Sequence, residues 1–326
     1  MLSLEAATDD AASVGWNAAV FTSRETPAAV MEAVSAVLGG ARRNTIVDVL
    51  VNGNPRLADA ISALCVREPG CAAQARLRVW HIAMGDKAHA WNTYVHRIWP
   101  GGDITYFIDG YVRVDTHAFA RLERVMHANP EALGGTGVPS IGRSASALRN
   151  EMAREGGLHG NLFAIKRGTM KTLRNKGFHL PLGIYRTDST IGAALAFGLD
   201  PSSQQWDPKQ RIAQAPDVTW QTRPQRWWNL GDVRTHLRRL DRQAQGRLEN
   251  RAVSDWLAQR KLPPHTLPRT ALELVAQWAK REPLAFETAL AGSRRIRRAW
   301  QALQSPRDWS QAELPPVLTF DSLAGR

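Results

Sequence analysis

Short apolar runs alternate with turn residues and helical spacing through the first third of the chain. Four of these runs predict β-strands, because each is apolar and stops at small, polar or acidic residues. They are Ala18–Thr22, Asn44–Val51, Ala75–Ile82 and Ile104–Ile108. Helical spacing follows each run, so strand, turn and helix recur at intervals of roughly 30 residues. The sequence therefore predicts an α/β fold with a Rossmann-like, mainly parallel mixed sheet flanked by helices.

The remainder of the chain is less regular up to residue 225 and helical beyond it. Between 139 and 222 the pattern predicts a loop, two helices and two strands, at 139–144, Ala145–Glu155, Ile191–Phe197, Asn161–Lys166 and Asp217–Thr222. We therefore predict one domain over residues 1–225, with halves at about 16–115 and 116–225. A basic, tryptophan-rich helical extension follows over residues 226–326.

Positive charge is concentrated in the C-terminal part. The chain has a formal net charge of +12; residues 1–200 carry 21 Lys and Arg against 18 Asp and Glu, and residues 201–326 carry 21 against 12. Two arginine groups stand out, Arg234, Arg238, Arg239 and Arg242, and Arg294, Arg295, Arg297 and Arg298. With the neighbouring tryptophans they could bind a lipid-linked acceptor or an anionic membrane surface. The alternatives are a solvated helix face and core tryptophans; no nucleic acid is expected.

Cysteine content and the N-terminal sequence bear on the compartment. Cys65 and Cys71 do not have zinc-site spacing, and two thiols suit a reducing compartment better than a disulfide framework. The N-terminal residues lack a signal-peptide pattern, and no uncharged apolar run approaches the length of a membrane span. These features predict a cytoplasmic protein, with peripheral contact at the inner face of the membrane left open.

The segment Gly102–Asp115 is the most informative in the chain. Its apolar run ends abruptly in Asp109, Gly110 and Tyr111, before helical spacing begins near His117. In open α/β sheets, ligands bind at the carboxyl ends of the strands. An acid followed by glycine at such an end suits phosphate or metal chemistry, although the same residues also form caps and turns.

Further motifs lie in colinear order around this strand end. Residues 85–92 read Gly-Asp-Lys-Ala-x-Ala-x-Asn, residues 160–165 read Gly-Asn-Leu-Phe-Ala-Ile, and Leu180-Pro181 precedes Thr187-Asp188. With Phe21–Glu25 at the end of the first strand, this order resembles the family 2 glycosyltransferases over roughly residues 16–222. The resemblance implies the GT-A fold. It also implies inverting transfer of a sugar from a nucleotide diphosphate to an acceptor hydroxyl, in glycan, polysaccharide or glycolipid synthesis.

The resemblance also assigns a donor site to the strand ends. It places the donor base near Thr22, Ser23 and Glu25, while Lys87, after a glycine turn, could supply positive charge for the diphosphate. From the residues alone, Ser23 and Glu25 could instead cap the next helix, and Lys87 could face solvent. Asn92 is expected to lock its turn.

The acceptor side has three candidates. By resemblance, Asp188 is the catalytic base that takes the proton from the acceptor hydroxyl, although an aspartate there could equally cap the following helix. His159 could contact phosphate or acceptor, or simply pack beside a loop, and Arg186 could hold a diphosphate.

The chain departs from the family pattern in places that affect the cofactor and the donor. The family usually has Asp-x-Asp at the strand end, where the carboxylates hold Mg2+ or Mn2+. Here the third position is Tyr111, and a phenol is a poor metal ligand near neutral pH. Asp109 is therefore the one predicted metal ligand, and the metal requirement is in doubt. Asn52 stands where the family often has a base-reading aspartate, so the donor is left open.

Two other classes of function compete with the glycosyltransferase hypothesis. One is a non-catalytic or degenerate GT-A-like basic binding protein, which Tyr111 and the basic C-terminal part suggest. The other is a sugar nucleotidyltransferase, which would need a glycine-rich loop with Arg and Lys after the first strand. Ser23-Arg24-Glu25 lacks that glycine.

Overall fold

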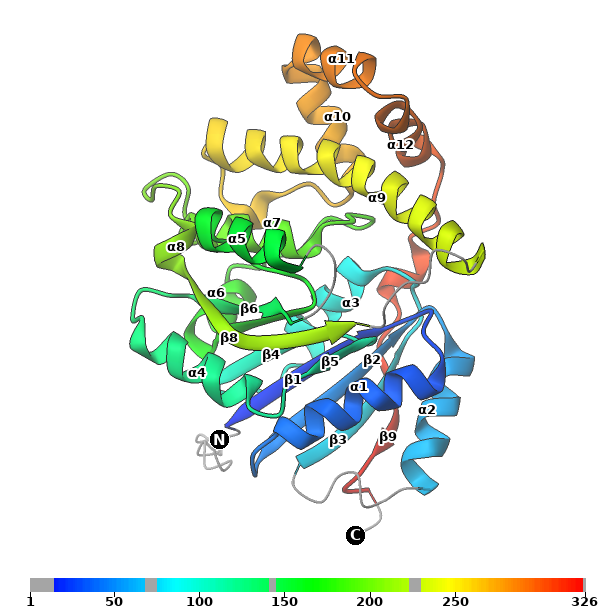
Figure 1. The fold of residues 1–326 in the computed structure, drawn as a ribbon. Helices are drawn as coiled ribbons and strands as arrows, with labels where there is room; N and C mark the ends of the chain where they lie inside the picture. Colours follow the sequence, from blue (N-terminus) through cyan, green and yellow to red (C-terminus); the bar gives the residue numbers. More distant parts are fainter. Residues whose placement is uncertain (1–14, 68–74, 141–144, 223–229, 325–326) are drawn as a thin grey trace, which may run out of the picture.

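The computed structural model describes residues 15–67, 75–140, 145–222 and 230–324. In the last of these ranges the side chains are described from residue 239 onward. Figure 1 shows a sheet with helices packed against it and a group of C-terminal helices beyond one end of the strands.

Nine strands form one sheet in the described part of the chain. They are β1 (Trp16–Thr22), β2 (Thr45–Asn52), β3 (Ala75–Ile82), β4 (Ile104–Asp109), β5 (Val112–Val114), β6 (Gly134–Pro139), β7 (Leu162–Lys166), β8 (Ile212–Thr222) and β9 (Val317–Asp321). Their order across the sheet is β5-β8-β6-β7-β4-β1-β2-β3-β9. The neighbours β3, β2, β1 and β4 are all parallel, so their carboxyl ends share one edge.

Twelve α-helices connect or cover these strands in the described residues. They are α1 (Pro27–Gly40), α2 (Pro55–Arg67), α3 (Lys87–Thr93), α4 (Ala118–Ala128), α5 (Ala145–Glu155), α6 (Arg167–Asn175), α7 (Thr187–Ala196), α8 (Pro208–Arg211), α9 (Leu230–Ser254), α10 (Ala271–Arg281), α11 (Pro283–Ala291) and α12 (Arg294–Gln304). None of them, as far as the structure describes them, is both long and apolar enough to cross a bilayer.

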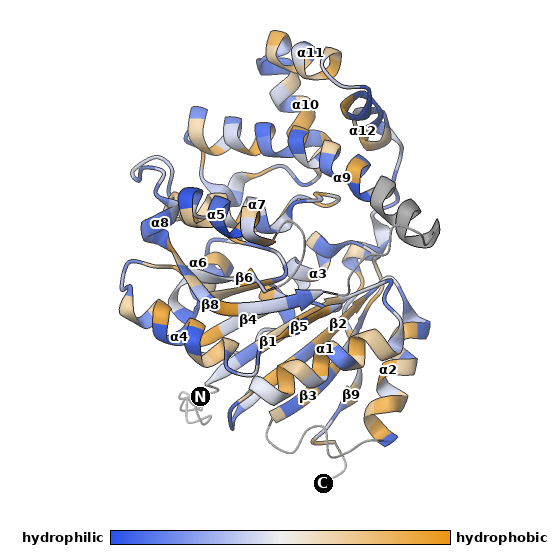
Figure 2. Ribbon diagram, in the orientation of Figure 1, coloured by the Kyte–Doolittle hydropathy of each residue, from blue (hydrophilic) through white to orange (hydrophobic). Residues whose placement is uncertain are grey.

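Alternate residues of the central strands pack into two cores, one on each face of the sheet. Val20 and Val49 belong to the core with α1, α2 and α4, whereas Phe21 and Leu50 belong to the core with α3, α6 and α7. Because both faces are covered, the strands are apolar at almost every position, as Figure 2 shows for the centre of the sheet.

The helices α9 to α12 pack against the second of these cores and not as a separate body. Leu248 of α9 and Trp278 of α10 are buried in the same cluster as Phe21. Trp256 is buried there too, and Trp300 packs edge-on against Phe286 with 5.2 Å between ring centroids. These tryptophans therefore belong to the core, which was the alternative to a role in membrane binding. Trp227 and Trp228 lie outside the described residues.

The last strand returns to the sheet from this helical region. β9 pairs antiparallel with β3, with Phe320 opposite Val79, and Asp321 Oδ1 accepts a hydrogen bond from Arg76 Nε at 3.1 Å. The predicted helical extension did not include this strand.

The predicted fold is confirmed at the level of its elements. All four early strands form within two residues of their predicted bounds, and β7 begins one residue later than predicted. β8 begins at Ile212, five residues before the predicted start at Asp217. β5 and β6 were not predicted. β6 begins Gly-Gly-Thr-Gly, which has little strand character in sequence, but close contacts with β7, β8 and α4 require those glycines. The predicted domain boundary at 225 falls in residues 223–229, outside the described part.

Candidate functional site

The ends of β1 and β4 touch at Gly110. Its backbone N–H donates to the Phe21 carbonyl oxygen at 2.7 Å, and a Cβ at position 110 would lie 2.7 Å from the Thr22 Cβ. Only glycine fits such an approach without displacing the first strand. The contact fixes Asp109 and Tyr111 beside the loop that follows β1.

Asp109 is the centre of a polar cluster at this edge. Lys87, the first residue of α3, pairs with Asp109 Oδ1, and the Tyr111 hydroxyl donates to Asp109 Oδ2 at 2.9 Å. The Tyr111 oxygen also lies 3.3 Å from Oδ1 of Asn161. The motifs at 85–92, 109–111 and 160–165, which are separated in sequence, therefore meet at one place.

The charges of neighbouring groups set the protonation states of Lys87 and Tyr111. Burial alone would lower the pKa of Lys87, but Asp109 first and then Asp188 raise it above its ordinary value, so Lys87 is an ammonium near neutral pH. The negative charge of Asp109 and the hydrogen bond to it hold the pKa of Tyr111 well above its usual range. Tyr111 is therefore a neutral hydrogen-bond donor and not a phenolate ligand.

The donor set limits how a metal ion could be held. Across the described ranges, no three His, Cys, Asp or Glu side chains lie close enough together to hold a metal ion. Asp109 offers one hard oxygen ligand that Mg2+ or Mn2+ would accept, and it is shared with Lys87 and Tyr111. Among the described residues, a cation at this place would have Asp109 as its single protein ligand. Oxygens of a bound donor would complete its coordination.

Asp188 faces this cluster from the second half of the sheet. It lies in the first turn of α7, whose N-cap is Arg186, and its Oδ2 accepts the backbone N–H of Gly160 at 2.9 Å. The alternative in which Asp188 caps its own helix is therefore wrong. Its carboxylate is directed toward the loop before β7, and it is close enough to Lys87 to raise the pKa of that lysine.

His159 lies beside Asp188 and is held in place by its surroundings. Its ring lies over Trp220 with 4.8 Å between centroids, and Nδ1 accepts the backbone N–H of Asn161 at 3.2 Å. Burial lowers the pKa of His159, although Asp188 and Asp109 act in the opposite direction. A neutral His159 with its Nδ1 occupied matches the expectation of a histidine packed beside a loop, and its contact with phosphate or acceptor stays a prediction.

The loop after β1 has its own hydrogen-bond network. Glu25 Oε2 accepts from the Thr22 hydroxyl at 2.7 Å and from the backbone N–H of Ser23 at 2.8 Å. Thr26, and not Ser23 or Glu25, caps α1. The suggested helix cap is therefore wrong, and Glu25 instead shapes the turn. A contact of Thr22, Ser23 or Glu25 with a donor base stays a prediction, as does one of Asn52, which is buried at the end of β2.

The segment Leu180–Arg186 leads into α7 and is held by buried polar side chains. Asn92 exchanges two hydrogen bonds with the backbone of Leu180, so it holds this distant segment and not, as expected, its own turn. Asp86 Oδ2 accepts from Gly183 N at 3.0 Å, and Glu249 of α9 accepts from Tyr185 N at 2.9 Å. Arg186 lies along α9, and its guanidinium forms no ion pair with a described residue. Its predicted contact with a diphosphate is untested.

Sequence reasoning missed Asp86, Asn161 and Glu249 as site residues. Asp86 and Asn161 lie inside the quoted motifs, so their position was visible although their contacts were not. Glu249 has no such signal, because it is one of many polar residues in the long helix α9.

Comparison with known proteins supports the fold. No family model matches the chain, and no curated protein matches it. The mannosyltransferase PcManGT from Pyrobaculum calidifontis, solved with GDP-Man and Mn2+, matches over 92% of this chain and 86% of its own, at 20% identity and a TM-score of 0.54. The chain therefore has a GT-A-type fold, as predicted.

Two further structures match less well, with TM-scores below 0.5. Glucosyl-3-phosphoglycerate synthase from Mycobacterium tuberculosis, solved with Mn2+, UDP-glucose and phosphoglyceric acid, is 14% identical, with a TM-score of 0.48 over 76% of this chain and 80% of its own. TarS from S. aureus is 10% identical, with a TM-score of 0.46 over 90% of this chain; the chain spans 56% of TarS.

Replacing Tyr111 by Asp should create a stronger cation site. A second carboxylate beside Asp109 adds a hard anionic ligand, so calorimetry with Mn2+ should show tighter binding than in the wild type, on the order of tenfold. Tyr111→Phe, which removes the hydroxyl but adds no ligand, is the control and should not tighten binding. Identical, tight binding in all three proteins would mean that the metal ligands lie elsewhere.

Proposed function

We propose that this protein is a glycosyltransferase that moves a sugar from a nucleotide diphosphate donor to an acceptor hydroxyl with inversion at the anomeric carbon. The observation that carries the proposal is the polar cluster at the carboxyl edge of the sheet, where Lys87 pairs with Asp109 and where Asp188 holds the backbone N–H of Gly160, next to Asn161 of the same cluster. An ammonium and two carboxylates thus lie at one site of the GT-A-type fold, and the proposal assigns the diphosphate to the first and the acceptor proton to Asp188.

Lys87 and Asp109 form the donor side of this proposal. A diphosphate is a stronger partner for an ammonium than a single carboxylate, so donor phosphates would draw Lys87 from Asp109. A divalent cation, held by Asp109 and the donor's phosphate oxygens, would offset charge on the departing diphosphate. Tyr111 would keep Asp109 oriented through the hydrogen bond to Oδ2.

Asp188 forms the acceptor side. It takes the proton of the acceptor hydroxyl as that oxygen bonds to the anomeric carbon. The bond from that carbon to the diphosphate oxygen breaks on the opposite face, and its electron pair leaves with the diphosphate. The hydrogen bond from Gly160 N to Asp188 Oδ2 orients the carboxylate, leaving Oδ1 for the proton.

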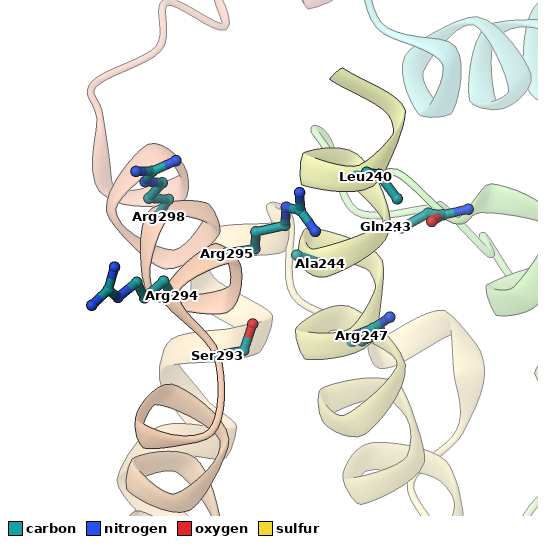
Figure 3. A pocket seen from close by; sticks show the side chains of 8 residues that line it. All are labelled: Leu240, Gln243, Ala244, Arg247, Ser293, Arg294, Arg295 and Arg298. Atoms are coloured by element: carbon teal, nitrogen blue, oxygen red, sulfur yellow. The ribbon is translucent and has the colours of Figure 1, made fainter. Parts of the chain in front are cut away.

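The basic surface of α12 is the proposed site of contact with a lipid-linked acceptor or an anionic membrane. Arg294, Arg295, Arg297 and Arg298 are exposed. A cleft of about 400 Å3 between α9 and α12 is lined by Leu240, Gln243, Ala244, Arg247, Ser293, Arg294, Arg295 and Arg298, with no acid among them (Figure 3). Arg295 extends between the two helices. Its Nε lies 3.8 Å from Oδ1 of Asp241, and this ion pair is weak because both side chains are exposed. Arg234 and Arg238 lie outside the described side chains.

The direct test of the proposed function is release of nucleoside diphosphate from a panel of sugar nucleotides, with and without Mn2+. Turnover of one donor class would support a glycosyltransferase. Release of pyrophosphate during sugar nucleotide formation would instead identify a nucleotidyltransferase, and donor binding without turnover would identify a degenerate binding protein.

Asp109→Asn should keep the fold and lose turnover by about 100-fold or more. Asparagine is isosteric but carries no charge to hold a cation or to orient Lys87, and electrostatic stabilisation of a leaving group is worth several kcal/mol. Steady-state assays with the best donor, alongside circular dichroism for the fold, provide the measurement. Wild-type activity in this variant would remove Asp109 from the mechanism.

Asp188→Asn should separate binding from chemistry. The amide keeps an oxygen acceptor for Gly160 N but cannot take a proton, so donor affinity should survive while transfer collapses. Calorimetric donor titration and turnover on the same preparation measure the two effects. Near-normal turnover with reduced thermal stability would assign Asp188 a structural role instead.

Neutralising Arg294, Arg295, Arg297 and Arg298 together should weaken binding to anionic liposomes by roughly 1 kcal/mol for each charge that approaches the surface. The loss should shrink at high salt, because screening weakens the wild-type attraction. A matched control neutralises four exposed arginines of the first half, Arg43, Arg56, Arg67 and Arg124, and should change binding less. If the wild-type protein does not bind anionic liposomes at low salt, the arginines of α12 form only a solvated helix face and the proposed membrane contact is wrong.

A further inference from the structure

One face of α9 contacts the segment that leads to Asp188. Four residues contribute, Arg242, Gln245, Gly246 and Glu249, at the spacing i, i+3, i+4 and i+7 that places residues on one side of a helix. Arg242 lies over the Tyr185 ring at 5.4 Å, and Gln245 Nε2 donates to the Gly183 carbonyl oxygen at 3.0 Å. A C-terminal helix therefore contacts three residues of Gly183–Arg186.

Glu249 makes the strongest of these contacts. Its two carboxylate oxygens accept the backbone N–H of Tyr185 at 3.0 and 2.9 Å, and Oε2 accepts that of Arg186 at 3.3 Å. Gln245 Nε2 donates to Oε1 at 2.7 Å. In its ionised form Glu249 fixes this turn more firmly than a neutral acceptor would, because charge-assisted hydrogen bonds are about twice as strong.

This arrangement is costly for stability. Glu249 is 0% exposed and forms no ion pair with a described residue, and burial raises its pKa to about 7. The Arg186 charge offsets only part of this effect, and burying an acid without a directly paired cation costs several kcal/mol, which an apolar side chain of similar size would avoid. Packing alone therefore gives no reason for a glutamate at this position, whereas a fixed backbone at Tyr185 and Arg186 does.

Gly246 allows the two segments to touch. A Cβ at this position would lie 2.9 Å from Cγ of Arg186, so the backbone of α9 packs directly on that side chain. Arg186 is the N-cap of α7, and Asp188 follows two residues later. Any movement of the Tyr185–Arg186 backbone is thus passed to the first turn of α7, where the Asp188 carboxylate is located.

We propose that Glu249 is a positioning residue: from α9 it fixes the Tyr185–Arg186 backbone and thereby places the Asp188 carboxylate for proton transfer. This inference rests on the proposed function, in which Asp188 is the base. Misplacing a reacting group by about 1 Å can cost on the order of 100-fold in rate, so a segment that ends at the base requires such restraint.

The test compares Glu249→Met, which removes both acceptors but keeps much of the volume, with Glu249→Gln, which keeps one acceptor. Turnover is measured well below the melting temperature of each protein. We expect Glu249→Met to lower kcat at least tenfold with donor affinity within about twofold, and Glu249→Gln to recover part of the loss. Wild-type kcat in Glu249→Met would overturn the proposal.

Two further variants separate positioning from general stability. Gly246→Ala leaves Glu249 intact but presses a methyl group against Arg186, and it should lower kcat in the same way. Asp255→Asn breaks the ion pair of another buried acid in the C-terminal helices, with Arg281, away from the segment. It should lower the melting temperature without lowering kcat. An equal loss of kcat in Asp255→Asn would show that Glu249 acts through stability alone.

Amide hydrogen exchange tests the restraint by Glu249 without any assay of glycosyltransferase activity. In Glu249→Met the Tyr185 and Arg186 amides should exchange faster than in the wild type, and in Asp255→Asn they should not. If the wild-type protein turns over no sugar nucleotide, the proposed function fails, while unchanged exchange at these two amides in Glu249→Met would overturn the restraint itself.

Discussion

The contact of the β1 and β4 ends at Gly110 is the constraint on which the site depends. A second close contact acts beside it, since a Cβ on Gly53 would lie 2.4 Å from Cα of Gly85. The first contact brings Asp109 to the loop after β1, and the second brings the start of α3, with Lys87, to the end of β2. Two glycine contacts therefore bring together the loops at four strand ends.

The motif at 85–92 divides its polar side chains between two tasks. Asp86 and Asn92 are buried and hold Gly183 and Leu180, whereas Lys87 between them pairs with Asp109. A single turn and helix thus set both the position of the Lys87 ammonium and the path of the segment that ends at Asp188. With Glu249 on the opposite side, that segment lies between the sheet domain and the C-terminal helices.

Much of the fold could be predicted from the sequence, but most hydrogen bonds and ion pairs of the site could not. The strands and helices follow from apolar runs and turn residues that act locally, and the edge that holds Asp109 follows from parallel topology. The acids at 86, 109 and 188 were visible in the sequence, but their partners were not. Whether an acid caps its own helix, as suggested for Asp188, or accepts from Gly160 depends on contacts between distant segments. Glu249 lies more than 60 residues from Tyr185, and local patterns carry no information about such a pair.

The pairing of β9 with β3 has a consequence for how the protein is made. Phe320 is opposite Val79, so about 240 residues separate the two strands. Until β9 has left the ribosome, the outer edge of β3 has no strand partner among the described elements and offers unpaired N–H and C=O groups to other chains. Contacts between such distant residues also form slowly, because a long loop must close first. Nascent chains would therefore need protection of this edge for most of their synthesis, and conditions that slow elongation should favour aggregation through β3.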